Sequence, residues 1–260
     1  MNRIEKALQM AKEKNKKAFV PYVMAGDGGL NGLMDQILFL EKCGATAIEI
    51  GIPFSDPVAD GPTIQAAGIR SLQLGTTLRD VLGTIRTIRP IVSIPLIIMT
   101  YLNPIYAYGV SSFIQDASKA GIDGCIIPDL PIEEEEIVEP QLSASGIELI
   151  RLVTLTSPLE RVKEIANRGR GFLYAVTVTG ITGARSDFHE EVGEYLQKIK
   201  EVSPIPVLAG FGISTPEHVR KMGQYCDGVV VGSKIVDLLH RDQKDEIEAL
   251  IKGTNPVQIS

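Results

Sequence analysis

The 260-residue chain has no tryptophan, only three cysteines, and fewer basic than acidic residues. The cysteines, Cys43, Cys125 and Cys226, lie far apart without a C-x-x-C pair, so neither a disulfide framework nor a zinc site is indicated. Lys and Arg number 26 against 32 Asp and Glu, which gives a net charge of −6. Nucleic-acid binding needs clustered positive charge, and this balance argues against a nucleic-acid partner.

Long apolar runs are also missing. The most apolar stretch, residues 91–99, is too short to cross a bilayer and contains Pro95. Residues 1–5 begin an amphipathic helix rather than a signal peptide. We therefore expect a cytoplasmic protein with no membrane partner.

Three common kinds of catalytic group are absent as well. No lysine falls within or at the end of a predicted strand, which argues against Schiff-base chemistry. His189, His218 and His240 fall at or near helical segments, so a histidine-based metal site is not expected. No G-x-G-x-x-G follows a strand, so a dinucleotide is not indicated. We expect neither a metal nor a cofactor in this chain.

What the chain does have is a regular alternation of short apolar runs and amphipathic segments. Eight strands are predicted, at residues 18–23, 46–50, 96–101, 123–127, 147–154, 172–178, 205–209 and 227–231. Continuous apolar strands that alternate with helices indicate a parallel sheet covered by helices. Eight evenly spread units favour a closed (β/α)8 TIM barrel over an open doubly wound sheet. We expect one α/β domain over residues 1–260.

Some helix boundaries can be predicted from capping residues. Asn2, with Glu5 three residues later, predicts the start of an extra N-terminal helix before the barrel. An acidic helix is predicted from Glu133. Ser157 is the expected N-cap of the helix that has Pro158 as its first residue.

One carboxylate lies at the end of the second predicted strand. Period-2 alternation places Glu49 on one face with Ala47, and Ile48 and Ile50 on the other. The isoleucines suit the helix-facing side, so Glu49 should point into the barrel mouth. A partly desolvated carboxyl there has a raised pKa and can act as a general acid and base. The alternative is a structural glutamate paired with Lys or Arg, and we favour catalysis.

Two further carboxylates, Asp56 and Asp60, follow in the next loop. Each alone is typical of turn chemistry, because an Asp side chain hydrogen-bonds its own backbone. A carboxylate on the strand end and another on the loop can, however, address two positions of one substrate.

Glycine-rich loops follow the last two strands. Residues 210–212 (G-F-G) and 232–233 (G-S) each precede a helix, and backbone amides at such positions bind phosphate. The two loops together favour a phosphorylated substrate. Residues 179–185, after the sixth strand, are punctuated by glycine and fit either a mobile lid or a plain surface loop.

Residues 49–62, E-I-G-I-P-F-S-D-P-V-A-D-G-P, closely resemble the signature of the tryptophan synthase α subunit family. Supporting matches run along the chain: Pro21-Tyr22, residues 101–104, residues 128–131, Thr182-Gly183 with Arg185, residues 210–213 and Gly232-Ser233. Two departures stand beside them. Thr177 replaces a serine that is usual after strand six, and Thr154-Leu155 replaces an Ala-Pro after strand five.

The resemblance implies a lyase that cleaves indole-3-glycerol phosphate to indole and glyceraldehyde 3-phosphate, in the last stage of tryptophan biosynthesis. Glu49 would move protons between the substrate hydroxyl and indole C3, and Asp60 would hold the indole N–H. Tyr22 stands where phenylalanine is common in the family. The other matched positions would bind substrate: Tyr22, Met99, Tyr101, Ile126, Tyr174, Thr182, Gly183, Phe211, Gly212, Gly232 and Ser233.

The resemblance also implies an α2β2 complex, in which the β subunit carries pyridoxal phosphate and receives indole through a tunnel. Residues 53–62 and 103–108 are then a docking surface for the β subunit, or else ordinary surface loops. Two alternatives remain open. The chain could be mainly an allosteric subunit with little activity of its own, or another phosphate-binding barrel such as an isomerase of a phosphoribosyl substrate.

Overall fold

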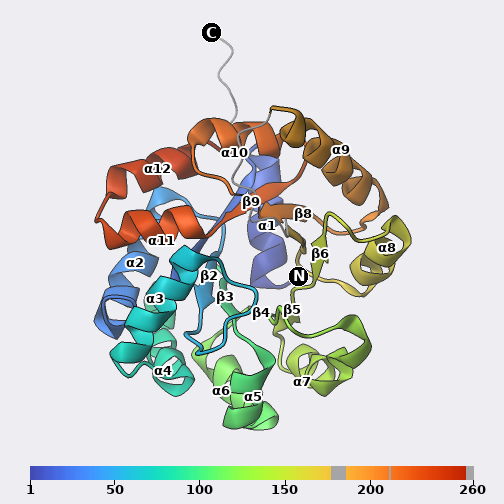
Figure 1. Ribbon diagram of the computed structural model, residues 1–260. Coiled ribbons are helices and arrows are strands. Elements are labelled where there is room, and N and C mark those ends of the chain that lie inside the picture. The colour runs from blue at the N-terminus through green and yellow to red at the C-terminus, as the bar shows by residue number, and fades with distance from the viewer. Residues whose placement is uncertain (177–185, 211, 256–260) are drawn as a thin grey trace.

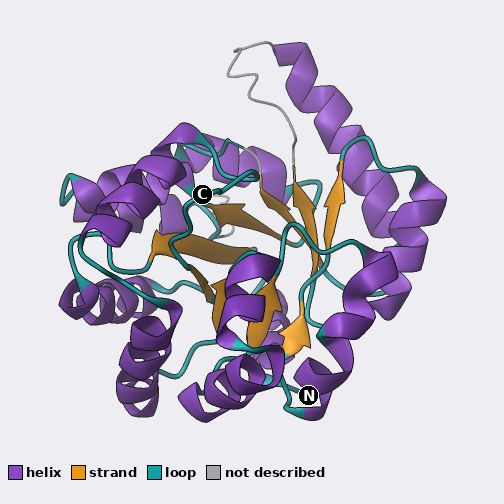
Figure 2. Cartoon of the chain, turned by 60° about the horizontal axis from the view of Figure 1, so that its bottom comes forward, coloured by secondary structure: helices purple, strands orange, loops and turns teal. Residues whose placement is uncertain are grey.

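The computed structural model describes residues 1–176, 186–210 and 212–255, with residues 186–190 as backbone only. Parallel strands form a ring, and helices enclose it (Figures 1 and 2). The strands are β1 Ala18–Met24, β2 Ile48–Gly51, β3 Leu96–Met99, β4 Gly124–Ile126, β5 Glu148–Leu149, β6 Leu152–Thr154, β7 Leu173–Val176, β8 Val207–Gly210 and β9 Gly228–Val231.

The helices lie between successive strands on the outside of the ring, except for α1 (Figure 1). They are α1 Arg3–Glu13, α2 Leu30–Cys43, α3 Pro62–Gln73, α4 Leu78–Ile88, α5 Leu102–Tyr108, α6 Val110–Ala120, α7 Glu139–Ala144, α8 Leu159–Arg168, α9 Ser186–Val202, α10 Pro216–Gly223, α11 Ser233–His240 and α12 Lys244–Lys252. Two short 3-10 helices, η1 Arg89–Ile91 and η2 Ile132–Ile137, complete the set.

The ring closes at the fifth barrel strand, which is divided into two segments. In the strand order β5-β4-β3-β2-β1-β9-β8-β7-β6, the two edges are consecutive in the chain. The amide of Ile150 donates to Cys125 on the β4 side, and the carbonyl of Arg151 accepts from Tyr174 on the β7 side. The predicted (β/α)8 barrel is therefore confirmed, whereas the prediction of one uninterrupted strand at residues 147–154 is wrong.

Two hydrophobic cores follow from the alternation of side chains along the strands. Ile48 and Ile50 pack in the larger core between the strands and the helices. Ala47 packs inside the barrel, with residues such as Ile97 and Val230 from other strands. The predicted facing of the second strand is confirmed, and Glu49 shares the inward face of Ala47.

Helix α1 covers the end of the barrel at which the strands begin, in the centre of the ring (Figure 1). Its predicted start is confirmed, because the side chains of Asn2 and Glu5 cap each other's backbone amides. Ile4 and Leu8 are buried in the inner core. Arg3 makes an ion pair with the buried Asp123, just before β4, at 2.8 Å. Helix α1 thus covers the inner core at the end where the strands begin, and the cavity described below lies at the opposite end.

Two other local predictions are wrong. Residues 132–137, expected to be an acidic α-helix from Glu133, form the 3-10 helix η2, and α7 begins only at Glu139. Ser157 does not cap α8, because its hydroxyl accepts from the Thr154 amide at 3.1 Å and Pro158 takes the N-cap position.

Candidate active site

A cavity of about 1280 Å³ lies at the end of the barrel where the strands terminate. It is lined by several residues proposed from the sequence: Tyr22, Glu49, Asp60, Met99, Tyr174, Gly212, Gly232 and Ser233. Parallel barrels build their working sites at this end, because loops from every strand converge there. The structure thus brings together residues that are up to about 210 positions apart in the sequence.

Glu49 is the most unusual of these residues, because it is a carboxyl group with 1% exposure. Within the described part of the chain its Oε2 has no hydrogen-bond partner, and no Lys or Arg makes an ion pair with it. Burial, and then the charge of Asp60, raise the pKa of Glu49 to about 8. The alternative of a structural, ion-paired glutamate is therefore not what the described residues show. At neutral pH the group is protonated and can donate a proton.

Asp60 faces the same cavity from the loop between β2 and α3. Burial raises the pKa of its carboxyl, and a hydrogen bond from Tyr101 lowers it. The Tyr101 hydroxyl also accepts from the Ala59 amide at 2.9 Å, which ties the loop to the end of β3. Asp56, in contrast, is exposed, and its carboxylate accepts a hydrogen bond from the side-chain hydroxyl of Ser55.

Two tyrosines lean over glycines on the neighbouring strands. Tyr22 lies opposite Glu49 in the register of β1 and β2, and a Cβ at Gly51 would overlap its hydroxyl. Tyr174 lies opposite Leu208 in the register of β7 and β8, and a Cβ at Gly210 would lie 2.5 Å from its ring. In both pairs the tyrosine fills the space above an inward-facing glycine, so both rings stand in the barrel mouth.

The expected phosphate end is formed by the loops after β8 and β9. Gly212 has a positive φ of 24°, and Gly232 is the N-cap of α11, whose first residue is Ser233. Amides at a helix N-terminus favour an anion. Lys234, which follows Ser233, also lines the cavity, and its ammonium lies 3.3 Å from Glu246.

Not every residue proposed from the sequence reaches the cavity wall. Ile126 is fully buried in the inner core, and the neighbouring Ile127 lines the cavity instead. Tyr101 acts through its contacts with Ala59 and Asp60, outside the lining itself. Thr182, Gly183 and Phe211, together with the loop at residues 179–185, lie outside the described residues.

Sequence reasoning missed the charged arm of the cavity, which is the part of the cavity wall formed by Glu135 and Arg151 beside the fifth barrel strand. Glu135 and Arg151 both line it, and their side chains form an ion pair at 2.8 Å with about a tenth of each exposed. The only sequence signal was Arg151 itself, a charged residue in the middle of an apolar strand. Its partner comes from η2, and this pairing could not be predicted from local patterns.

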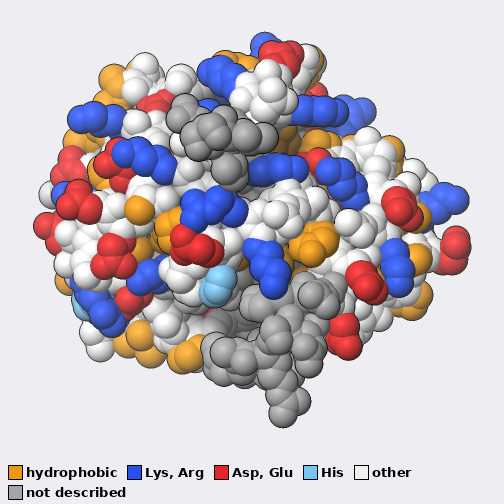
Figure 3. Space-filling model, turned by 90° about the horizontal axis from the view of Figure 1, so that it is seen from above, with side chains coloured by type: hydrophobic (Ala, Val, Ile, Leu, Met, Phe, Trp, Pro, Cys, Tyr) orange, Lys and Arg blue, Asp and Glu red, His pale blue; other side chains and the backbone are white. Residues whose placement is uncertain are grey.

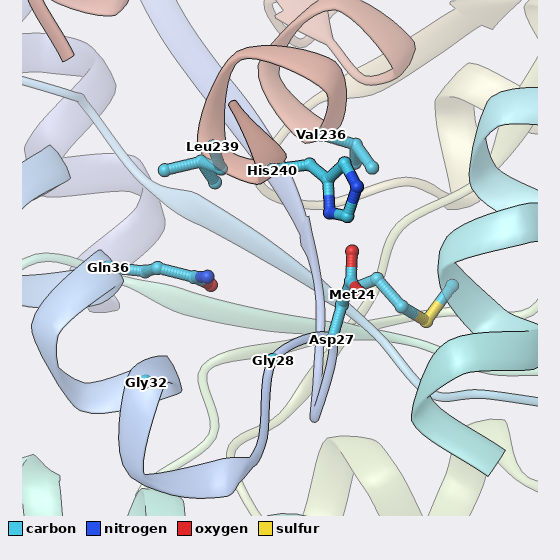
Figure 4. A pocket seen from close by; sticks show the side chains of 8 residues that line it. All are labelled: Met24, Asp27, Gly28, Gly32, Gln36, Val236, Leu239 and His240. Atoms are coloured by element: carbon cyan, nitrogen blue, oxygen red, sulfur yellow. The ribbon is translucent and has the colours of Figure 1, made fainter. Parts of the chain in front are cut away.

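A second, smaller cavity of about 180 Å³ lies between the loop after β1 and α11. Figure 4 shows the carboxylate of Asp27 and the imidazole of His240 pointing toward one another across it, with Gln36 reaching in from α2. Arg70 holds the Asp27 carboxylate by two hydrogen bonds of 2.7 Å. The guanidinium of Arg70, which is not part of the cavity lining, thus already balances the negative charge of Asp27.

Neither a metal cluster nor a membrane span is found in the described part of the chain. No group of three or more His, Cys, Asp or Glu residues there is arranged to hold a metal ion. Among the helices that the structure describes, none has the length and apolarity needed to cross a membrane. On the face seen in Figure 3, Lys and Arg side chains are interspersed with Asp and Glu.

A closed parallel barrel whose mouth holds two carboxyl groups, one of them buried and without an ion pair to any described residue, defines a barrel enzyme of the acid–base type. The family model of the tryptophan synthase alpha chain matches residues 8–258. The chain belongs to this family.

Known relatives agree with this assignment along the whole chain. A tryptophan synthase alpha chain of Bacillus cereus (strain ATCC 10987 / NRS 248) is 53% identical over 247 residues, covering 95% of this chain and 96% of that protein. The crystal structure of a tryptophan synthase alpha chain from Legionella pneumophila subsp. pneumophila has a TM-score of 0.90 at 32% identity and covers 100% of both chains. A structure of Mycobacterium tuberculosis tryptophan synthase has a TM-score of 0.90 at 32% identity, covering 98% of this chain and 99% of that one.

Members of this family are lyases that act on indole-3-glycerol phosphate in tryptophan biosynthesis. The family and the enzyme class expected from the sequence are therefore confirmed, and the isomerase alternative is set aside. The same comparisons support a tryptophan synthase β subunit as the partner.

Proposed function

We propose that Glu49 and Asp60 carry the cleavage of indole-3-glycerol phosphate in the cavity at the barrel mouth, and that residues 1–260 act as one domain. The observation that supports this most directly is the buried Glu49, which has no ion-pair partner among the described residues and whose pKa is raised further by the charge of Asp60. A carboxyl with a pKa of about 8 is close to the operating pH, where a group can both give and take a proton efficiently.

The proton transfers balance within the substrate and Glu49. Protonated Glu49 gives its proton to indole C3, which places positive charge on the ring nitrogen. The Asp60 carboxylate accepts a hydrogen bond from the ring N–H and stabilises that charge. The Glu49 carboxylate then takes the proton of the side-chain hydroxyl. The bond from C3 to the hydroxyl-bearing carbon breaks, its electrons restore the aromatic ring, and the carbon leaves as an aldehyde.

The substrate-binding residues divide between the two ends of the cavity. Tyr22, Met99 and Tyr174 are near the carboxyl groups and suit the flat indole ring. Gly212, Gly232 and Ser233 present backbone amides to the phosphate, and Gly183 and Phe211 belong to this end by resemblance. Tyr101 supports Asp60 by its hydrogen bond. By resemblance alone, Thr182 is proposed to contact Asp60 on closure, and Ile126 to form part of the wall around the indole ring.

The partner is proposed to be a β subunit in an α2β2 complex in the cytoplasm. The β subunit carries the pyridoxal phosphate, and the α chain holds no cofactor. Residues 53–62 connect β2 to the start of α3, and residues 103–108 belong to α5, so both segments follow strand ends on the side of the barrel where the cavity opens. Val58 and Tyr106 are 84% and 51% exposed, which supports their use as a docking surface.

One experiment tests the assignment of Glu49. Indole release from indole-3-glycerol phosphate is measured with and without a β subunit, for the natural chain and for Glu49→Gln. We expect a loss of at least about a thousandfold in the variant, because it removes the only group that moves the proton. Glu13→Gln, on the exposed side of α1, is the control and should retain full activity.

Cleavage by Glu49→Gln at the natural rate would contradict the acid–base role. No release by the natural chain, even with its partner, would instead favour the mainly regulatory subunit. Thermal unfolding of each protein is measured as well, and we expect each variant to remain folded.

A further inference from the structure

The hydroxyl of Tyr22 occupies a defined position between Glu49 and the cavity mouth. Tyr22 is 3% exposed and lies opposite Glu49 on the adjacent parallel strand. Its ring leans toward the mouth, over Gly51, and the hydroxyl takes the place of the side chain that Gly51 lacks. Residues 49 and 51 face inward on the same strand, so the hydroxyl is the next group above Glu49 on that face.

This hydroxyl is a hydrogen-bond donor without an acceptor in the described part of the chain. Four titratable groups face it: Glu49 and Asp60 from β2 and its loop, Tyr101 after β3, and Tyr174 from β7. Among the described residues no Lys or Arg contributes to its environment. Burial, and then the charges of Asp60 and Glu49, hold the pKa of Tyr22 well above its usual value. The hydroxyl therefore keeps its proton throughout the pH range of the protein.

Glu49 needs such a donor only in one of its two states. As a neutral acid it is buried at little cost, although its Oε2 has no partner among the described residues. Once it has given up its proton, a buried carboxylate without hydrogen bonds is costly. A hydrogen bond to a charged group is shorter and stronger than one to a neutral group.

We propose that Tyr22 is a positioning residue for Glu49. Its hydroxyl donates a hydrogen bond to the Glu49 carboxylate formed after substrate protonation, and holds that carboxylate toward the substrate hydroxyl. This inference rests on the proposed function. Tyr101 is less suited to the task, since its hydroxyl already contacts Ala59 and Asp60. Tyr174 is the competing donor, because among the charges that raise the pKa of its hydroxyl, that of Glu49 has the largest effect.

The test is Tyr22→Phe, which keeps the ring and removes only the hydroxyl. The ionisation of Glu49 is followed directly, by the infrared band of its protonated carboxyl in difference spectra against Glu49→Gln. Without the hydrogen bond the carboxylate is less stable, so we expect the pKa of Glu49 to rise by about one unit. We also expect kcat to fall about tenfold and KM to change less than about twofold.

Two matched variants separate this role from a structural one. Tyr195→Phe also removes a hydroxyl, one that donates to the backbone carbonyl of Ser157 from α9, and should change neither the pKa of Glu49 nor kcat. Tyr174→Phe should leave the pKa of Glu49 within about 0.3 units of the natural value, well inside the one-unit effect of a charge-assisted hydrogen bond.

An unchanged titration of Glu49 in Tyr22→Phe would overturn the proposal, as would a shift produced by Tyr174→Phe instead. A rise in KM without a change in kcat or in the pKa of Glu49 would also contradict it, and would show that Tyr22 only packs against the indole ring. Failure of the proposed function is seen separately, as inactivity of the natural chain, because the infrared titration does not depend on turnover.

Discussion

Glu49 is a side chain that the folded chain accommodates at lower cost when it is neutral than when it is ionised. Its pKa of about 8 in the fold, against 4.5 for an ordinary glutamate, means that folding favours the protonated form. The stabilisation from this proton is complete below pH 4.5 and is lost as the pH rises through about 8. A group kept for chemistry therefore destabilises the protein at neutral pH.

Glu49→Gln is accordingly expected to stabilise the chain while it abolishes cleavage. The two proteins should unfold at similar temperatures near pH 4.5, and the variant should be more stable by about 3 kcal/mol at pH 7. This difference corresponds to a rise of roughly 6–12 °C in Tm for a chain of this size. Calorimetry at several pH values measures it. A difference that does not grow with pH would show that Glu49 is ionised in the native state.

At this scale the sequence predicted Glu49 from physical reasoning and Asp60 mainly from resemblance. The alternation of Ala47, Ile48, Glu49 and Ile50 is local, so the inward direction of Glu49 could be deduced. The function of Asp60 depends on a loop path and on Tyr101, which is 41 positions away, and turn chemistry explains an Asp-Gly equally well. Ile126 was proposed from resemblance alone, and in the structure the neighbouring Ile127 lines the cavity.

The divided fifth strand is the main departure at the scale of elements. Residues 147–154 read as one apolar strand because side-chain alternation continues without interruption through them. The division lies in the neighbouring strand to which each residue is hydrogen-bonded, β4 for Ile150 and β7 for Arg151, and this depends on distant residues. The 3-10 helix η2 has a more local cause. Residues 133–136 are four consecutive glutamates, and repulsion between like charges weakens an α-helix there.

The ion pair behind this strand allows a test of its own. Arg151→Met is expected to cost about 3 kcal/mol of unfolding free energy, because it leaves Glu135 buried with only the half-exposed Arg168 at 3.3 Å. Replacing both partners, in Glu135→Leu with Arg151→Met, should recover most of the loss, since no buried charge then remains. Urea denaturation measures both.

Arg161→Met is the control for this pair, because its ion pairs with Glu133 and Glu164 lie at the surface and should contribute less than about 1 kcal/mol. An equal loss in the single and the double variant of residues 135 and 151 would show that packing, rather than charge, governs this region.

The barrel fold of the whole molecule could be predicted from the sequence better than several of its local features. Each of the eight strand–helix units is too apolar to be stable alone, and a closed ring is one of the few arrangements that bury all of them. The observed strand order follows the chain around this ring. The size of the cavity, its charged arm and the second cavity beside α11 arise from side chains of distant elements. No local pattern contains that information.

The proposed docking surface makes a prediction about the complex. Tyr106→Asp, on α5 beside the mouth, is expected to weaken binding to the β subunit at least tenfold, because a charge would be buried at the interface. Cleavage by the isolated chain should not change. Titration calorimetry with a purified β subunit measures the affinity.

Ile91→Asp is the matched control for that surface, since Ile91 is 61% exposed at the other end of the barrel, before β3. Equal weakening by both substitutions would contradict docking at residues 103–108.

The position of α1 also sets the order in which the molecule can be assembled. Ile4 lies against Gly124 and Gly171, and it shares the inner core with Phe172 and Leu208. Because these contacts come from much later in the chain, α1 has no complete docking site until most of the barrel has been synthesised. During translation its apolar face remains in solvent or on a chaperone, and α1 is among the last helices to reach its place.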